Sequence, residues 1–180
     1  MNHLITAERV DEPAGFANTY HHWTGTSPNG ALDSASNWTE YIYENAGETY
    51  MHESGPPKSH WCARISQNRS ALAGKNARFL ALEVAGSLTV EKGVKVAAHN
   101  ELRVSDGGQV VLNGGLLESA RWVDIQAGGS LEGNGLIRAE LFTKGILSLS
   151  GKKPLVIDGN AYLSGELKLS SFPSPKMDKS

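Results

Sequence analysis

The sequence predicts an all-β protein whose main part is a right-handed parallel β-helix, or β-solenoid, of about four coils between about Phe79 and Leu169. Three observations predict this fold: the sequence repeats every 20 to 23 residues, apolar residues alternate with polar ones inside each repeat, and glycines recur at fixed places. A fixed period of roughly 20 to 25 residues is typical of solenoids, in which each coil buries its apolar side against its neighbours.

The repeat can be written as four segments, each of which opens with an alternating apolar pair such as Leu82 and Val84. They begin at Leu82, Leu102, Val123 and Ile146 and read LEVAGSLTVEKGVKVAAHNE, LRVSDGGQVVLNGGLLESARW, VDIQAGGSLEGNGLIRAELFTKG and ILSLSGKKPLVIDGNAYLSG. A period of two residues predicts a strand that points one row of side chains inward and the other outward. We therefore expect stacked apolar columns inside and the following side chains in water: Glu83, Glu91, Lys92, Lys95, Arg103, Asp124 and Lys168.

Glycines mark the corners of the coils, since 14 of the 20 glycines lie between Gly86 and Gly165. They follow the first and the second strand of each segment, and tight corners often require a positive φ, which glycine adopts without a steric penalty. This placement predicts three short strands per coil. An antiparallel sandwich would instead have turn signals about every 8 to 12 residues.

The two ends of the chain differ from the repeat region (76–170) in composition. Residues 1–75 hold five of the six histidines and three of the four tryptophans. We predict that they form an irregular, partly β cap, because an open solenoid end exposes strand edges. Residues 171–180 are polar and contain Pro173 and Pro175, which predicts an extended tail.

The last coil would then be bare, and three explanations stay open. The tail folds back over it, the native chain continues beyond it, or the open end contacts another subunit. The third explanation implies a homo-oligomer, such as a trimeric surface fibre.

Composition and charge argue against several classes of partner. The formal net charge is −2 and no Lys/Arg cluster stands out, so we expect no nucleic-acid partner. No apolar run approaches the roughly 18 to 20 residues of a membrane helix, and MNHLITAERVDEPAG at the N-terminus lacks the pattern of an export signal. The single cysteine, Cys62, allows no internal disulfide.

Two motifs stand out in the sequence. One is the coil pattern GSLTV, GGQVVL and GGSL, which begins at Gly86, Gly107 and Gly128. The other is WTGTSPNGALDSASNW, from Trp23 to Trp38, ahead of the repeats. Together they resemble the coil pattern, and the segment that often precedes it, of bacterial autotransporter-like surface and secreted proteins with β-helical passenger regions. The resemblance implies a β-helix at the cell surface or outside the cell.

The aromatic residues of the N-terminal part are the predicted ligand site. Tryptophan and tyrosine rings offer large apolar faces with a polar group, which suits a pyranose ring. The candidate glycan-binding residues are Trp23, Trp38, Tyr41, Tyr43 and Trp61. In the other interpretation these aromatics only plug the end of the solenoid.

We predict no catalytic residues, no metal site and no cofactor. His52, His60 and Cys62 are close in sequence, but their spacing matches no known zinc motif. A polysaccharide-cleaving β-helix enzyme needs converging carboxylates on its outer face. The carboxylates of the repeat region are scattered along the sequence: Asp106, Asp124, Glu132, Glu140 and Asp158.

The leading hypothesis is a non-catalytic extracellular β-solenoid module that serves as a structural stalk or adhesin element with glycan binding. The alternative is a fragment of a polysaccharide-cleaving β-helix enzyme, either a lyase or a glycoside hydrolase. The two hypotheses differ in whether the protein releases products from a polysaccharide or only retains it.

Overall fold

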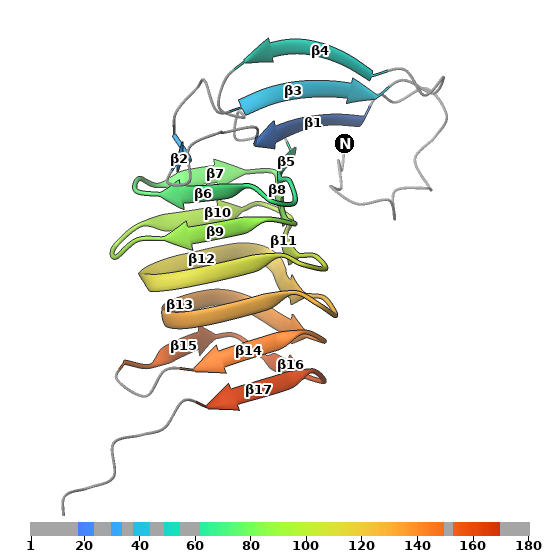
Figure 1. Ribbon diagram of the computed structural model, residues 1–180. Coiled ribbons are helices and arrows are strands. Elements are labelled where there is room, and N and C mark those ends of the chain that lie inside the picture. Colours follow the sequence, from blue (N-terminus) through green and yellow to red (C-terminus); the bar gives the residue numbers. More distant parts are fainter. Residues whose placement is uncertain are drawn as a thin grey trace, which may run out of the picture.

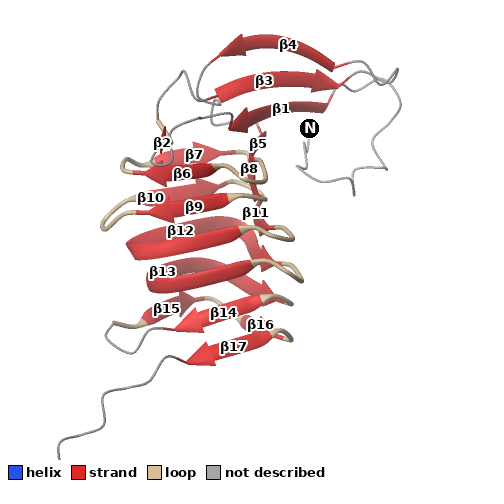
Figure 2. Cartoon of the chain, viewed as in Figure 1, coloured by secondary structure: helices blue, strands red, loops and turns tan. Residues whose placement is uncertain are grey.

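A computed structural model of the protein describes residues 18–23, 30–33, 38–43, 49–54, 62–149 and 153–169, with side chains in 30–33, 62–149 and 153–169. All secondary structure in these residues is strand (Figure 2). The strands stack in parallel as the coils of a β-solenoid, which confirms the predicted fold class (Figure 1). The described residues include no helix that is long and apolar enough to span a membrane.

Two long strands, β12 (Gln109–Ile125) and β13 (Ser130–Thr143), bend around the solenoid and contribute to three faces. The first face contains β5 (Cys62–Ile65), β8 (Ala81–Val84), β11 (Glu101–Val104), residues 122–125 of β12, residues 140–143 of β13 and β16 (Ala161–Leu163). Each strand pairs with the next in parallel, so equivalent positions of successive coils lie above one another.

The second and third faces are built in the same way. The second face contains β6 (Ser70–Ala73), β9 (Ser87–Val90), residues 109–112 of β12, residues 130–133 of β13, β14 (Ile146–Leu149) and β17 (Glu166–Leu169). The third face contains β7 (Ala77–Phe79), β10 (Lys95–Ala98), residues 116–119 of β12, residues 135–138 of β13 and β15 (Leu155–Asp158). The described strands make five complete coils and two strands of a sixth.

Aliphatic side chains from every second position of the three faces fill the interior. In the first face, for example, Leu82, Leu102 and Val123 lie directly above one another and are fully buried. The period of two residues in each short strand thus produces continuous apolar columns, as the sequence predicts. This packed interior leaves the outer face as the place for chemistry.

The stack begins one coil before the predicted start at Phe79. Strands β5, β6 and β7 pair in parallel with β8, β9 and β10, so residues 62–79 form the first complete coil. Small inward residues such as Ala63, Ala71 and Ala73 line part of this coil. Alanines give a weaker strand signal than the leucines and valines of later coils, so the sequence predicts a cap in place of this coil.

The predicted alignment of the coils is right for three segments and wrong for the fourth. Val123 pairs with Leu141, whereas Ile146 pairs with Ser130 in the second face. The coil that begins at Val123 is shorter than the one before it. Three residues separate Glu118 from Trp122 in β12, whereas only Ala139 separates their partners Arg138 and Glu140 in β13. The apolar strand after the Lys144–Gly145 corner therefore resembles the start of a coil without being one.

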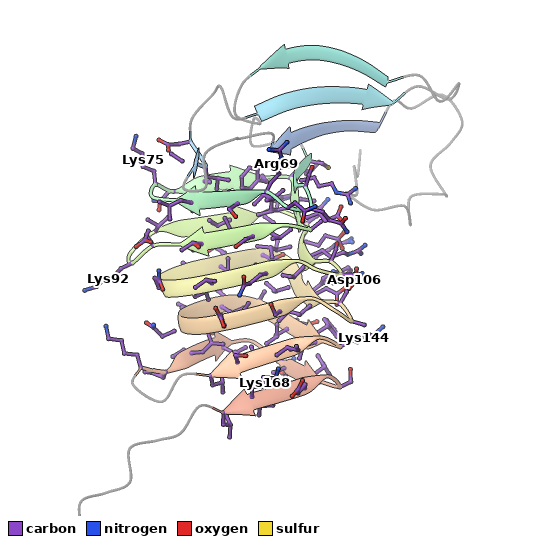
Figure 3. All side chains as sticks on the ribbon, in the orientation of Figure 1. Arg69, Lys75, Lys92, Asp106, Lys144 and Lys168 are labelled. Atoms are coloured by element: carbon purple, nitrogen blue, oxygen red, sulfur yellow. The ribbon has the colours of Figure 1, made fainter. Side chains whose placement is uncertain are left out.

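Some of the corners between the first and second faces contain a residue with positive φ, which is Asn68 in the first coil and a glycine in later coils. Gly107 and Gly128 have φ angles of +74° and +80°, which side chains with a Cβ rarely adopt. Figure 3 shows Asp106 and Lys144 projecting from these corners, and Lys75 and Lys92 projecting from the corners between the second and third faces.

Strands at the N-terminal end extend the stack and add an antiparallel layer. Strand β1 (Asn18–Trp23) pairs in parallel with β5, and β2 (Gly30–Ala31) pairs in parallel with β6. Strands β3 (Trp38–Tyr43) and β4 (Thr49–Ser54) continue from β1 in antiparallel order. They lie at the end of the stack opposite β17 (Figure 1).

At the other end of the solenoid, which we call the open end, no coil follows β16 and β17 among the described residues. Leu163, Leu167 and Leu169 occupy inward positions of the sixth coil, yet all three are exposed. No strand among the described residues pairs with the free edges of β16 and β17. The predicted tail, 171–180, lies outside the described residues.

Candidate functional site

Charged side chains of alternating sign follow one another on the outer side of the first face. Arg64, Glu83, Arg103 and Asp124 occupy the same register position in four successive coils. Equal positions in paired strands are direct neighbours, so Glu83 and Arg103 each lie between two charges of the opposite sign. We call these four residues the charge ladder.

The charge ladder is largely buried at its centre, which corrects the prediction that Glu83 and Arg103 face water. Only 5% of Glu83 and 7% of Arg103 is exposed. Oppositely charged neighbours let these side chains lie against the sheet: Arg64 Nε is 3.6 Å from Glu83 Oε2, and Arg103 Nε is 3.8 Å from Asp124 Oδ2. The predicted exposure is correct for Lys92 and Lys168.

Two more contacts hold the ladder in place. Ser105 Oγ donates a hydrogen bond of 2.6 Å to Glu83 Oε1, and Arg103 Nη2 is 3.5 Å from Glu101 Oε1. Buried charges are retained when they are paired in this way, because an unpaired one costs several kcal/mol. The ladder is therefore a structural element of the first face.

Three aromatic side chains continue the same outer face toward the open end. The Phe142 and Tyr162 rings are stacked, with centroids 4.7 Å apart and planes at 8°, and the Trp122 ring meets Phe142 edge-on at 6.5 Å. We call Trp122, Phe142 and Tyr162 the aromatic strip. Exposure rises along the strip, from the half-buried Trp122 and Phe142 to Tyr162, which is 50% exposed.

Polar contacts fix the upper end of the aromatic strip. Trp122 Nε1 donates a hydrogen bond of 2.9 Å to Glu101 Oε2, and the Arg121 guanidinium lies 5.4 Å from the centroid of the Trp122 ring. The indole is thus held at a fixed angle between a buried carboxylate and an exposed cation. Such a ring presents one well-positioned apolar surface.

The outer side of the third face carries a second row of charges, with one member replaced by alanine. Its register positions are Arg78, Ala97, Glu118, Arg138 and Asp158. Beside Ala97 lies a hollow of about 390 Å³, which the long polar side chains of Arg78, His99, Glu118 and Arg138 surround. The hollow exists because alanine leaves open the space that a long side chain would fill.

The charges below the hollow are paired with one another. Arg138 contacts Glu118 through Nη1 and Asp158 through Nε, both at 3.2 Å, and Lys95 Nζ is 3.2 Å from Glu118 Oε1. Burial alone would raise the pKa of Glu118, but the hydrogen bonds from Lys95 and Arg138 outweigh it and lower this pKa. Hydrogen bonds to Asp158 and Glu118 raise the pKa of Arg138.

The Arg78 guanidinium differs from these charges. In 62–149 and 153–169 it contacts no carboxylate and makes no side-chain hydrogen bond, although it is exposed at the edge of the hollow. His99 is also exposed there, and its backbone N–H donates to the carbonyl of Phe79. Among the described residues, the Arg78 end of the hollow is therefore lined by a guanidinium and an imidazole that form no ion pair.

The aromatics predicted from the sequence are placed by their backbone only. Trp23 lies directly opposite Trp38 in the β1–β3 ladder, and Tyr41 and Tyr43 also belong to β3. Their side chains, and all of Trp61, lie outside what the structure describes. The glycan-binding role of these five residues stays a prediction.

The carboxylates considered for catalysis lie on different parts of the solenoid. Asp124 and Glu140 belong to the first face, Glu132 to the second and Asp158 to the third, and Asp106 lies at a corner. In the described part of the chain, no three His, Cys, Asp or Glu side chains come together in a group that could hold a metal ion. Cys62 is fully buried.

Comparison with known proteins adds no relative to this description: no family model, no curated protein and no solved structure matches the chain.

Sequence reasoning missed both features of the outer face. The aromatic strip was visible as Trp122, Phe142 and Tyr162, which are spaced 20 residues apart, close to the length of one coil, although Trp122 itself pairs with Glu140 because that coil is short. The hollow was visible only after alignment of the third strands, because Ala97 then interrupts a row of charged residues. An analysis of the outward positions of the repeat finds the aromatic strip but not the hollow.

Proposed function

We propose that this protein is a non-catalytic extracellular β-solenoid module, a structural stalk or adhesin element that binds glycan on its outer face. The aromatic strip is the observation that carries this proposal. Its rings lie on consecutive coils about 4.8 Å apart, the spacing of parallel strands. Aromatic faces with polar groups beside them suit the apolar face and the hydroxyl groups of a sugar ring.

The charges near the strip support binding rather than catalysis. Asp124 and Glu101 each lie next to Arg103, and Glu118 contacts Lys95 and Arg138. Glycoside cleavage uses a pair of carboxyl groups about 5 to 10 Å apart, one of which keeps its proton. Against the effect of burial, hydrogen bonds from Lys95 and Arg138 lower the pKa of Glu118, so this carboxylate does not keep the proton that cleavage needs.

The location and the role as a stalk rest on the resemblance to autotransporter-like surface proteins. A row of stacked coils is a rigid spacer, because each coil contacts only its neighbours and the interior is filled. The N-terminal aromatics Trp23, Trp38, Tyr41, Tyr43 and Trp61 are a second proposed contact with glycan. They would lengthen the binding surface at the other end of the stack.

Affinity electrophoresis of the full chain through gels that contain single polysaccharides tests this proposal. We expect at least one polysaccharide to retard the protein, and Tyr162→Ala to weaken the retardation about tenfold, since one stacking aromatic contributes roughly 1 kcal/mol or more. Val156→Ala is the matched control, because Val156 is 48% exposed on the third face and Tyr162 is 50% exposed on the first.

Two outcomes would contradict the proposal. Absence of retardation by every polysaccharide would remove the glycan-binding part. Release of shortened or unsaturated products from a polysaccharide, lost in Asp124→Asn, would remove the non-catalytic part and favour the enzyme fragment.

A further inference from the structure

The hollow on the third face supports a more specific assignment of ligand. We propose that it is a subsite for an acidic sugar of a polysaccharide, whose carboxylate binds the Arg78 guanidinium beside His99. This inference rests on the proposed glycan-binding function and names the chemical class of the glycan. A volume of about 390 Å³ falls at the lower end of the range for small-molecule pockets.

The first argument is the unbalanced charge of Arg78. Every other charge of its row that borders the hollow is paired, since Glu118 and Arg138 contact each other at 3.2 Å. An arginine fork matches a carboxylate with two parallel hydrogen bonds, which a lysine or a histidine cannot provide. Arg78 therefore favours a ligand with a planar carboxylate over a neutral sugar.

The second argument is that the hollow lies between a positive and a negative side chain. Ala97 lies between Arg78 and Glu118 in the register of the third face, one coil from each. A sugar ring over Ala97 would have Arg78 on one side and Glu118 on the other. Glu118 accepts hydrogen bonds from sugar hydroxyl groups and, being ionised, repels a second carboxylate placed at its end of the hollow.

The residues that line the subsite are also close in sequence to the aromatic strip. Ala120 lines the hollow and is followed by Arg121, whose guanidinium lies over the Trp122 ring. The two sites thus occupy adjoining faces at one corner of the solenoid. A single polysaccharide that bends around this corner would contact both.

Affinity electrophoresis with polygalacturonate, which carries one carboxylate per sugar, tests the assignment. We expect Arg78→Gln to raise the apparent dissociation constant about tenfold, the usual effect of losing one charge-assisted bidentate contact. Arg69→Gln is the matched control, because Arg69 is also exposed but lies at a corner of the first coil (Figure 3). Both variants lose one positive charge, so general attraction to a polyanion changes equally.

A neutral counterpart distinguishes this proposal from the function on which it rests. Methyl-esterified polygalacturonate keeps the sugar rings and removes the charge, so we expect the effect of Arg78→Gln to disappear with it. Equal effects of Arg78→Gln and Arg69→Gln on polygalacturonate would overturn the acidic subsite and leave glycan binding intact. Retention of no polysaccharide at all would overturn both.

The open end of the solenoid carries a second, independent inference. We propose that two copies of the chain associate through β17 about a twofold axis. The exposed inward residues Leu163, Leu167 and Leu169 lie below Thr143, Leu147 and Leu149, of which Thr143 and Leu147 are buried and Leu149 is partly buried. A free strand edge beside such a surface is a template for another chain.

Symmetry and charge fix the register of this contact. A twofold axis makes β17 antiparallel to its copy, and opposite residues must then point to the same side of the sheet. Centring the axis on Leu167 places Leu167 against Leu167, and Glu166 against the partner's Lys168 twice. Within one chain Glu166 and Lys168 already lie 3.6 Å apart, on the outer side.

Charge reversal combined with light scattering on the full chain tests this register. We expect a dimer for the natural sequence and a dissociation constant at least about tenfold higher for Glu166→Lys or Lys168→Glu, because like charges then face each other twice. The double variant E166K/K168E restores both pairs and should restore the dimer. Circular dichroism checks that each variant remains folded.

Three outcomes would overturn the second inference. A natural chain that stays monomeric at high concentration excludes the association. A mass that keeps rising beyond two copies indicates an open fibre in place of a closed twofold pair. Failure of the double variant to recover the dimer excludes the register.

Discussion

The middle coils and the last coil of the solenoid place the same kind of residue in different surroundings. Leu131, Leu147 and Leu167 occupy one inward column of the second face. The first two are buried, whereas Leu167 is 46% exposed, because no coil covers it in the described part of the chain. In a solenoid the coil below completes the environment of a residue, so stability is a sum over neighbouring coils.

The largest expected loss of stability comes from truncating a buried leucine of this column. Leu131→Ala should lower the free energy of unfolding by about 3 kcal/mol, from lost apolar burial and the cavity that remains. Leu167→Ala should lower it by less than about 1 kcal/mol, because the side chain is already half in water. Urea unfolding at a concentration where the chain is monomeric measures both values, and equal losses would contradict the open end.

The charge rows of the first and third faces extend the comparison to polar residues. Removing Arg103 leaves Glu101 and Asp124 without their cation, and Glu101 is buried. Arg103→Met should therefore cost about 2 kcal/mol, the usual penalty for an unsatisfied buried group. Arg138→Met should cost less than about 1 kcal/mol, because Arg138 is exposed and its ion pairs are screened by water.

Urea midpoints for the two arginine variants give this difference directly. Methionine keeps the apolar stem of the side chain, so the comparison isolates the charge. A smaller loss for Arg103→Met than for Arg138→Met would show that the buried ladder contributes no net stability.

Two exposed corner glycines, Gly74 and Gly107, allow the same kind of comparison for backbone conformation. A Cβ on Gly74 or on Gly107 would meet no atom within 4 Å, yet only Gly107 has a positive φ, +74°. Gly107→Ala should cost about 1 kcal/mol of conformational strain, whereas Gly74→Ala should be neutral or slightly stabilising. The difference in melting temperature between the variants measures the strain without a steric contribution, and equal shifts would contradict this explanation.

The stacked strands could be predicted from the sequence because the signal was local and repeated. Leu82, Leu102 and Val123 share one phase, and Gly107 and Gly128 stand at equivalent corners. The fourth segment failed because coil length varies with the corner, and Ala139 replaces a longer corner. A shortened corner changes the alignment of every later strand without changing its alternation.

The site was less accessible to prediction, since it depends on neighbours from different coils. Glu83 reads as a surface residue in its own strand, and its burial follows from Arg64 and Arg103 one coil away on either side. Likewise, the hollow beside Ala97 depends on long side chains of other coils. Alternation predicts whether a residue points outward, but only the register predicts what it meets there.

The smallest expected effect concerns pH and the exposed charge row. Lys95 and Arg138 lower the pKa of Glu118, against the opposing effect of burial. A lowered pKa means that the stabilising contribution is complete above the unfolded-state pKa, about 4.3, and is lost as the pH falls through the folded-state value. At neutral pH this contribution should be below about 1 kcal/mol, because both cations are partly exposed.

Glu118→Gln keeps the shape of the side chain and removes its titration. We expect the natural chain to be slightly more stable than this variant at pH 7 and pH 6, and the difference to shrink below about pH 5. All other carboxylates titrate in both proteins, so the difference between their urea midpoints isolates Glu118. A difference that persists unchanged at pH 3 would mean that Glu118 stabilises the third face through packing instead of charge.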